Sequence, residues 1–582
     1  MNPFVHILVF ALYIAFFPVL YFLPSLYYPL VKFGFGFVNF FRKRHSVPKI
    51  TDPLLLISAT KAAELIRNKE ALEEAAKVDE YMDSVNKDSD EVKKLKKEKS
   101  LFGIPFTVKD SMDVKGREIT VGMTIRQGVI SKEDAEVVKN AREAGGILLG
   151  ITNVPECLMA YETYNSIFGV TCNPYDTRRS PGGSSGGEGA LISACGSLIG
   201  IGSDIGGSIR IPSFYNGLFG LKATQFFVPT KGQLPDGFND EGFKKKMHSV
   251  GPMVRYIEDI PLCLKAFNPE GAKDLKLDEE VDISKVKVFF MEALPIEAGA
   301  EPVMPAIKEK LKEVAEFFEA ENGITTQGIS FLELQQAFDM LMTSVSEGSP
   351  IPHFICKDKV FFMEALPIEA GAEPVMSSIK EKLKEVVEFF EAENGITTQG
   401  ISFLELQQAF DMLMTSVSEG SPIPHFICKD KRELEGAKLL IELVKSLFGV
   451  SNHMFNVLVW IIQGQMDKRT PEEKQLLIEK IERLREKILG ILEKENAVIL
   501  MPTWPYTPAF HGYAVWADPA LAYTGIWNFL TLPALQCPTG LDNNGIPTGL
   551  SIIGAPNKDA VLLALGRKIG ELYGGWQAPW AK

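Results

Sequence analysis

The sequence lacks the cysteine and histidine patterns that mark disulfide frameworks and metal sites. Its 582 residues include seven cysteines, an odd number with no CxxC pair, and seven histidines without metal-ligand spacing. Scattered cysteines favour reduced thiols in a cytosolic environment over a disulfide framework or a zinc site. We therefore expect neither a metal nor a cofactor.

A basic excess is also missing. The chain carries 61 Lys and Arg residues against 74 Asp and Glu residues, a net charge of −13. Nucleic-acid binding needs a basic stripe that neutralises phosphates, so a nucleic-acid partner is excluded. No asparagine lies in an N-x-S/T sequon, which a cytosolic domain permits.

Charge is absent from the N-terminal segment. Residues 7–30 are uncharged and mostly apolar, long enough to span a hydrocarbon core of ~30 Å, although three prolines interrupt their second half. A basic cluster at 42–45 follows, and the positive-inside rule places the rest of the chain on the cytoplasmic side. A signal peptide is the alternative, but no positive charge precedes the apolar stretch. We expect a single-pass membrane anchor with its basic flank over residues 1–46, followed by one domain over 47–582.

Short apolar runs alternate with helical patterns after residue 102. Residues 103–110 and 146–153 are strand-like, and residues 134–143 form a helical pattern that ends at a glycine pair. This alternation is typical of α/β architecture. The fold class we predict is α/β, with a large mixed central sheet flanked by helices on both faces, after an N-terminal transmembrane helix.

A tandem duplication of 72 residues interrupts this pattern. Residues 287–358 recur as residues 359–430, and the two copies differ at only three positions. Solenoid repeats diverge and number three or more, so a recent duplication or an error in gene assembly explains the repeat better. One sheet position accommodates one strand. We therefore expect the core to take its strand from residues 287–293 and its later helix from near 403–417.

Glycine and serine gather at residues 182–213, which read GGSSGGEGALISACGSLIGIGSDIGGSIRIPS. A flexible linker would not contain the apolar run in the middle, so tight backbone passages around a site fit better. The histidines lie away from this motif, so no Ser–His–Asp triad is expected. A serine could instead be activated by Lys109, if burial keeps that lysine neutral. On these residues alone, a lysine that snorkels from a strand end is the simpler interpretation.

The motif at 182–213 resembles that of the amidase signature family, and within it the membrane-bound fatty-acid amide hydrolases. Three further segments resemble the same family independently: GIPFTVKD at 103–110, NPYD at 173–176 and AYTGIWNFLTLPALQCPTG at 522–540. The resemblance implies that Lys109 is the general base and acts through Ser184 on Ser208, the nucleophile. A serine hydroxyl can bridge in this way because it both donates and accepts.

The same resemblance implies an oxyanion hole and a set of supporting residues. The hole would consist of the backbone N–H groups of Ile205, Gly206, Gly207 and Ser208. Ser185, Asp204 and Arg210 would fix this loop, although ordinary loop hydrogen bonding explains these three residues nearly as well.

The implied function is a membrane-anchored serine amidase that hydrolyses fatty-acid amides through an acyl-enzyme. Its expected partners are a lipid amide substrate and the membrane, and a homodimer is left open. An amidase of the same family that acts on small polar amides is one alternative. An inactive, misassembled or pseudoenzyme membrane protein is the other, because the chain carries the duplication and lacks a family segment of ~30 residues after residue 70.

Overall fold

One large sheet organises the protein. The computed structural model describes residues 69–84, 89–235, 246–293, 303–328, 354–356, 359–362, 399–400, 441–443, 445–446, 451–454, 457–458, 471–513 and 518–580. The strands of the large sheet are β1 (Pro105–Lys109), β2 (Ile147–Thr152), β5 (Ile199–Asp204), β6 (Phe219–Lys222), β7 (Ser249–Val254), β8 (Lys287–Phe290), β9 (Thr326–Gly328), β13 (Ala497–Pro502), β14 (Ala534–Leu541) and β15 (Pro547–Ile553). They lie in the order β2-β1-β5-β7-β6-β14-β15-β13-β8-β9.

The strand pairs at both ends of this order are parallel, and those in the middle are antiparallel. β1 runs parallel to β2 and β5, and β8 runs parallel to β13 and β9. The pairs from β5 through β15 to β13 are antiparallel. The predicted mixed sheet is thereby confirmed. β5, β13 and β15 are buried along their whole length, as strands are in a sheet covered on both faces.

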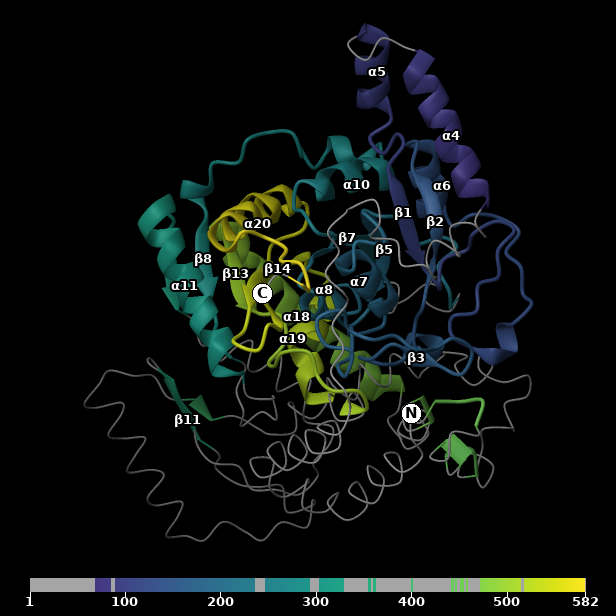
Figure 1. Ribbon diagram of the computed structural model, residues 1–582. Helices are drawn as coiled ribbons and strands as arrows, with labels where there is room; N and C mark the ends of the chain where they lie inside the picture. Colours follow the sequence, from purple (N-terminus) through teal and green to yellow (C-terminus); the bar gives the residue numbers. More distant parts are fainter. Residues whose placement is uncertain are drawn as a thin grey trace.

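Helices lie around the sheet, and several of them pack directly against it (Figure 1). They are α4 (Lys69–Ser84), α5 (Asp90–Glu98), α6 (Glu136–Glu143), α7 (Gly186–Ser193), α8 (Arg210–Tyr215), α10 (Asp259–Phe267), α11 (Pro305–Asn322), α18 (Pro471–Lys494), α19 (Ala522–Phe529) and α20 (Asp559–Tyr573). α7 contacts β1, β2, β5 and β7, whereas α20 contacts β14 and β15. The predicted order of strand, helix and strand over residues 103–153 is observed as β1, α6 and β2.

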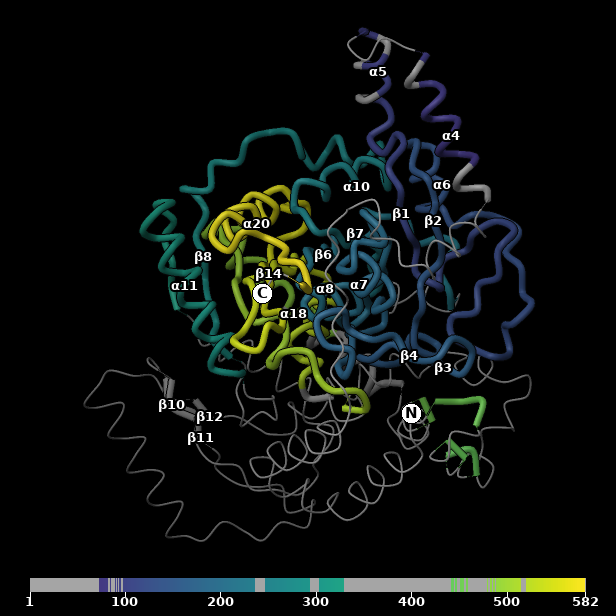
Figure 2. The backbone as a smooth tube through the Cα atoms, viewed as in Figure 1, coloured from purple at the N-terminus to yellow at the C-terminus, as the bar shows by residue number. Residues whose placement is uncertain are grey.

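The two ends of the sheet come from the two halves of the chain. The purple and blue tube of the earlier part of the chain contains β1, β2 and β7, and the teal to yellow tube of the later part contains β8, β14 and α20 (Figure 2). β6 and β14 pair where the halves meet, with Leu221 opposite Leu535. Segments more than 300 residues apart in sequence therefore meet at the middle of the sheet.

α11 shows how the sequence specifies one of these helices. Its buried residues Ile307, Leu311, Val314 and Phe318 recur at helical spacing and form one apolar face. Pro305 occupies the start of the helix, where a missing N–H costs nothing, and Gly323 ends it in the left-handed conformation at φ 61°. The first repeat copy thus contributes an amphipathic helix to the fold.

The two repeat copies contribute their identical strands to different sheets. β8, from the first copy, lies in the large sheet between β13 and β9. Its counterpart β11 (Lys359–Phe362) pairs with β10 (Phe354–Cys356) and β12 (Gln399–Gly400) in a separate three-stranded sheet. The core thus takes the first copy's strand, as expected, whereas the helix expected near 403–417 lies outside the described residues.

The membrane anchor predicted over residues 1–46 also lies outside the described residues. Among the helices that the structure does describe, none combines the length and the apolar character that crossing a bilayer requires.

Candidate active site

Lys109 is the last residue of β1, and its head group is buried. The side chain has 0% exposure, and Nζ donates to Ser184 Oγ at 2.7 Å and to Ser203 Oγ at 2.9 Å. Burial lowers the pKa of Lys109 to about 7, against opposing contributions from the charges of Asp204 and Glu188. A buried head group contradicts the simpler interpretation of a snorkelling lysine. Near neutral pH, a substantial fraction of this lysine is uncharged and can accept a proton.

Ser184 and Ser185 lie just before α7, and both are buried. The passage is tight, because a Cβ at Gly183 would lie 2.4 Å from the carbonyl oxygen of Ala160. Ser185 N donates to Ser208 O at 3.2 Å, which ties this segment to the loop that follows β5. The structure therefore brings Lys109 into contact with Ser184, and the backbone of Ser185 into contact with Ser208.

Ser208 is half-buried on the loop after β5. Among the described residues, its hydroxyl forms no hydrogen bond with Ser184. Of the two serines predicted to relay the proton, Lys109 therefore contacts Ser184 and not Ser208. The loop itself requires glycine at 207, where φ is 134° and a Cβ would lie 2.4 Å from Thr524 Oγ1.

Asp204 holds this loop in shape. Its carboxylate accepts from the backbone N–H groups of Gly207 at 2.7 Å and Ile209 at 3.1 Å. It also forms a fully buried two-pronged ion pair with Arg210, at 3.0 Å for both Nε and Nη2. Burial alone would raise the pKa of Asp204, but the charge and hydrogen bonds of Arg210 outweigh it and hold that pKa well below its usual range. Asp204 is therefore a permanent anion that fixes the turn.

The predicted oxyanion N–H groups divide into two kinds. Gly207 N–H is engaged by Asp204, as described above. Within the described part of the chain, the N–H groups of Ile205, Gly206 and Ser208 donate to no protein acceptor. Backbone amides left without a protein acceptor on a rigid turn are suited to bind a developing negative charge.

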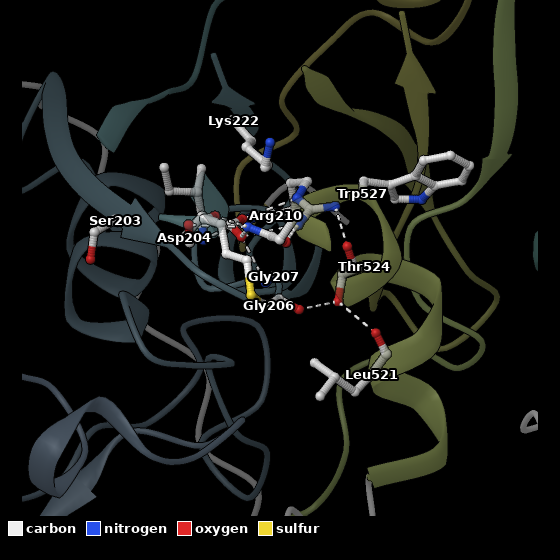
Figure 3. A network of polar contacts seen from close by, with 12 residues as sticks. Ser203, Asp204, Gly206, Gly207, Arg210, Lys222, Leu521, Thr524 and Trp527 are labelled. Carbon is white, nitrogen blue, oxygen red and sulfur yellow. Dashed lines mark hydrogen bonds and ion pairs between the residues drawn. The ribbon is translucent and has the colours of Figure 1, made fainter. Parts of the chain in front are cut away.

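α19, from the other half of the chain, braces the same loop (Figure 3). Thr524 Oγ1 donates to Gly206 O at 2.5 Å, and Arg210 Nη1 donates to Thr524 O at 2.9 Å. Asn528 accepts from Arg210 Nη2 at 2.6 Å and donates to Asp204 Oδ1 at 2.9 Å. All of these side chains are buried, so the loop is clamped between β5 and α19.

Sequence reasoning missed three of these residues. Ser203 lies within the motif at 182–213, and its place next to Asp204 was the available signal. Thr524 and Asn528 belong to a quoted family segment, but nothing local assigns them to a loop more than 300 residues away. Lys222 is a fourth buried polar residue near the loop (Figure 3). Its Nζ donates to Leu532 O at 2.8 Å.

In the described part of the chain, no group of three or more His, Cys, Asp or Glu side chains could hold a metal ion. The chemistry that the site offers is proton transfer by Lys109 and charge binding by backbone amides.

Comparison with known proteins identifies the class. The sequence profile of the family described as Amidase matches residues 55–354 and 363–563, and the chain belongs to this family. Fatty-acid amide hydrolase 2-A of Danio rerio is 30% identical over 577 residues, covering 92% of this chain and 93% of the relative. Fatty-acid amide hydrolase 2 of Homo sapiens is 29% identical, covering 91% of each chain. The resemblance stated from the motifs is thereby confirmed.

The fold is shared with solved structures of the same kind. The structure of a fatty acid amide hydrolase superposes with a TM-score of 0.56 at 20% identity, covering 82% of this chain and 74% of that one. At such identity the likeness speaks for the fold alone.

Proposed function

We propose that this amidase hydrolyses fatty-acid amides, with Ser208 as nucleophile and Lys109 as the base that acts through Ser184. The observation that carries the proposal most is the 2.7 Å hydrogen bond from fully buried Lys109 to Ser184. A lysine works as a base only when it is neutral, and burial lowers its pKa to about 7.

In the proposed reaction, neutral Lys109 takes the proton of Ser184, and Ser184 takes the proton of Ser208. The Ser208 oxygen forms a bond to the amide carbon, and the carbonyl oxygen becomes an anion. The N–H groups of Ile205, Gly206 and Ser208 bind that anion. The proton returns through Ser184 to the nitrogen of the leaving amine as the C–N bond breaks. Water then hydrolyses the Ser208 ester by the same proton path.

Two observations support a lipid amide over a small polar one. The relatives named fatty-acid amide hydrolase 2 match about nine-tenths of the chain. The apolar, uncharged residues 7–30 would keep the enzyme at a bilayer, into which an acyl amide partitions.

We propose a single-pass anchor over residues 1–46 and a cytoplasm-facing amidase domain over 47–582. Alkaline carbonate should leave the full chain in the membrane pellet and extract a chain without residues 1–46; equal extraction of both would refute the anchor.

The catalytic assignment is tested with a fluorophosphonate probe, which labels activated serines covalently. Wild type should be labelled, whereas Ser208→Ala should not. Ser551→Ala is the matched control, because it removes a buried serine hydroxyl of β15 whose partner is Thr503 and keeps the predicted nucleophile. Hydrolysis of acyl amides of graded chain length should increase with length. A wild type that hydrolyses only small polar amides would favour the alternative substrate, and a wild type that neither hydrolyses nor labels would favour the inactive protein.

A further inference from the structure

Glu188 is a buried carboxylate beside the proposed base. It lies in the first turn of α7, four residues after Ser184, and its side chain has 0% exposure. Thr107 Oγ1 donates to Oε2 at 2.6 Å, and Thr152 Oγ1 donates to Oε1 at 2.9 Å. A carboxyl group that accepts a hydroxyl proton at each oxygen has the hydrogen-bond pattern of the ionised form.

The sheet is shaped to receive this carboxylate. Thr107 is on β1, Thr152 is on β2, and Gly200 of β5 pairs in register with Thr107. A Cβ at Gly200 would lie 2.3 Å from Glu188 Oε2, so β5 needs glycine there to let the carboxylate reach the strands. Three adjacent strands thus converge on one side chain of α7.

The contact is directly linked to the catalytic geometry. Thr107 and Lys109 are two residues apart on β1, so their side chains leave the strand on the same face. Thr107 binds Glu188, and Lys109 binds Ser184. Two parallel contacts, four residues apart on the 184–188 segment, therefore hold the start of α7 against the end of β1.

Glu188 also acts on Lys109 by its charge. The charged and titratable groups that face Lys109 are Asp204 at the end of β5, Glu188 on α7, and His248 just before β7. Burial lowers the pKa of Lys109, while the charges of Asp204 and Glu188 raise it. Removal of the Glu188 charge should therefore lower the pKa of Lys109 further.

We propose that Glu188 is a positioning residue of this active site, which docks α7 on β1 so that Ser184 stays within reach of Lys109, and whose negative charge tunes that lysine. This inference rests on the proposed function, since it assumes that Lys109 is the base. Its carboxylate binds Thr107 on β1 and Thr152 on β2, so its proposed effect on the reaction runs through Lys109 and Ser184.

The test is the pH dependence of fluorophosphonate labelling, which follows the serine's activation without any assumption about the substrate. In wild type, the labelling rate should rise with pH as Lys109 loses its proton. In Glu188→Gln, which keeps the shape and removes the charge, the midpoint should fall by roughly half to one pH unit. The plateau rate should fall about tenfold, because a weaker and less well-placed base abstracts the proton more slowly.

Glu156→Gln is the matched control. Glu156 is another buried carboxylate, paired with His453 at 2.8 Å, and it is not among the groups that act on Lys109. This variant should lose thermal stability and keep the wild-type midpoint. Should Glu188→Gln fail to fold, Glu188→Asp decides, because it keeps the charge but shortens the side chain: the plateau should fall and the midpoint should stay near that of wild type.

The outcomes separate the two proposals. A Glu188→Gln midpoint and plateau equal to those of wild type would overturn the role of Glu188 and leave the proposed function standing. A Glu188→Asp plateau equal to that of wild type would overturn the docking role. A wild type that no probe labels at any pH would overturn the proposed function itself.

Discussion

Lys109 and Asp204 are both fully buried, and the fold treats their charges in opposite ways. Arg210 keeps Asp204 ionised, whereas burial lowers the pKa of Lys109 to about 7. A buried anion that braces a turn is useful only when it is charged. A buried base is useful only when it can be neutral, and that state carries a cost in folding free energy.

Lys109→Met is predicted to stabilise the protein and abolish its activity. The folded-state pKa of about 7 lies below the ordinary lysine pKa of 10.5, so between these values the unfolded state binds more protons. Wild-type stability should therefore rise with pH over this range, and the advantage of the variant should be largest at pH 7 and shrink toward pH 10. At pH 7 we expect the free energy of unfolding to increase by about 1–3 kcal/mol. This net gain already subtracts the contribution of the lost hydrogen bonds to Ser184 and Ser203.

Urea unfolding at pH 7 and pH 9, with fluorophosphonate labelling in parallel, measures both effects. Lys222→Met is the matched comparison for stability, because burial also lowers the pKa of Lys222 to about 7. A Lys109→Met variant that is less stable than wild type at pH 7 would contradict the expected burial cost.

Single residues also mark the limit of what the sequence could predict. Lys109, Ser184 and Ser208 lie in segments whose composition is improbable in ordinary loops, and the family match confirms the resemblance that these segments carried. The partners that hold the site lie in the same kind of segment, but their positions there do not reveal what they contact. Glu188 and Asn528 are polar residues in apolar helices, and only the folded structure places them against β1 and against Asp204.

At the scale of elements, α19 and the loop after β5 behave as one unit. The helix contributes donors and acceptors to a loop more than 300 residues away in sequence, and Gly207 leaves room for Thr524. The sequence predicted the two strands and the helix over residues 103–153 from their patterns. It could not predict this clamp, because periodicity reports which face of an element is buried and not which loop that face contacts.

Thr524→Val is predicted to slow catalysis more than it destabilises the fold. Valine fills the same space but cannot donate to Gly206 O, so the loop loses one support beside the predicted oxyanion amides. The loss of a single oxyanion donor costs about 10²–10³ in kcat, so a support residue should cost roughly tenfold. The free energy of unfolding should change by about 1 kcal/mol.

Thr539→Val is the matched control, since Thr539 is a buried threonine of β14 that donates to Thr548 at 3.0 Å. Steady-state amide hydrolysis and thermal unfolding should show a similar stability loss in both variants and a rate loss only in Thr524→Val. Equal rates in the two variants would show that the contact with α19 is structural alone.

At the scale of the whole molecule, the sheet has one place for a sequence that occurs twice. β8 fills the position between β13 and β9, and β11 pairs only with β10 and β12 within the described residues. Periodicity could not choose between the copies, because they are nearly identical. The flanking chain decides: β8 follows directly on the segment after α10, and its Lys287 N donates to Asn496 O beside β13.

A proline at equivalent positions of the two copies is therefore predicted to have opposite consequences. Val288 is fully buried, and its N–H donates to Thr325 O at 2.9 Å in the large sheet. Val288→Pro removes that donor from a strand with neighbours on both sides and should abolish folding and labelling. Val360→Pro makes the same change in the same local sequence, outside the large sheet, and should leave folding and labelling nearly intact.

Deletion of residues 359–430 leaves 582 − 72 = 510 residues and should likewise keep fluorophosphonate labelling and cooperative thermal unfolding. Loss of labelling in Val360→Pro and in the deletion alike would mean that the second copy belongs to the working fold.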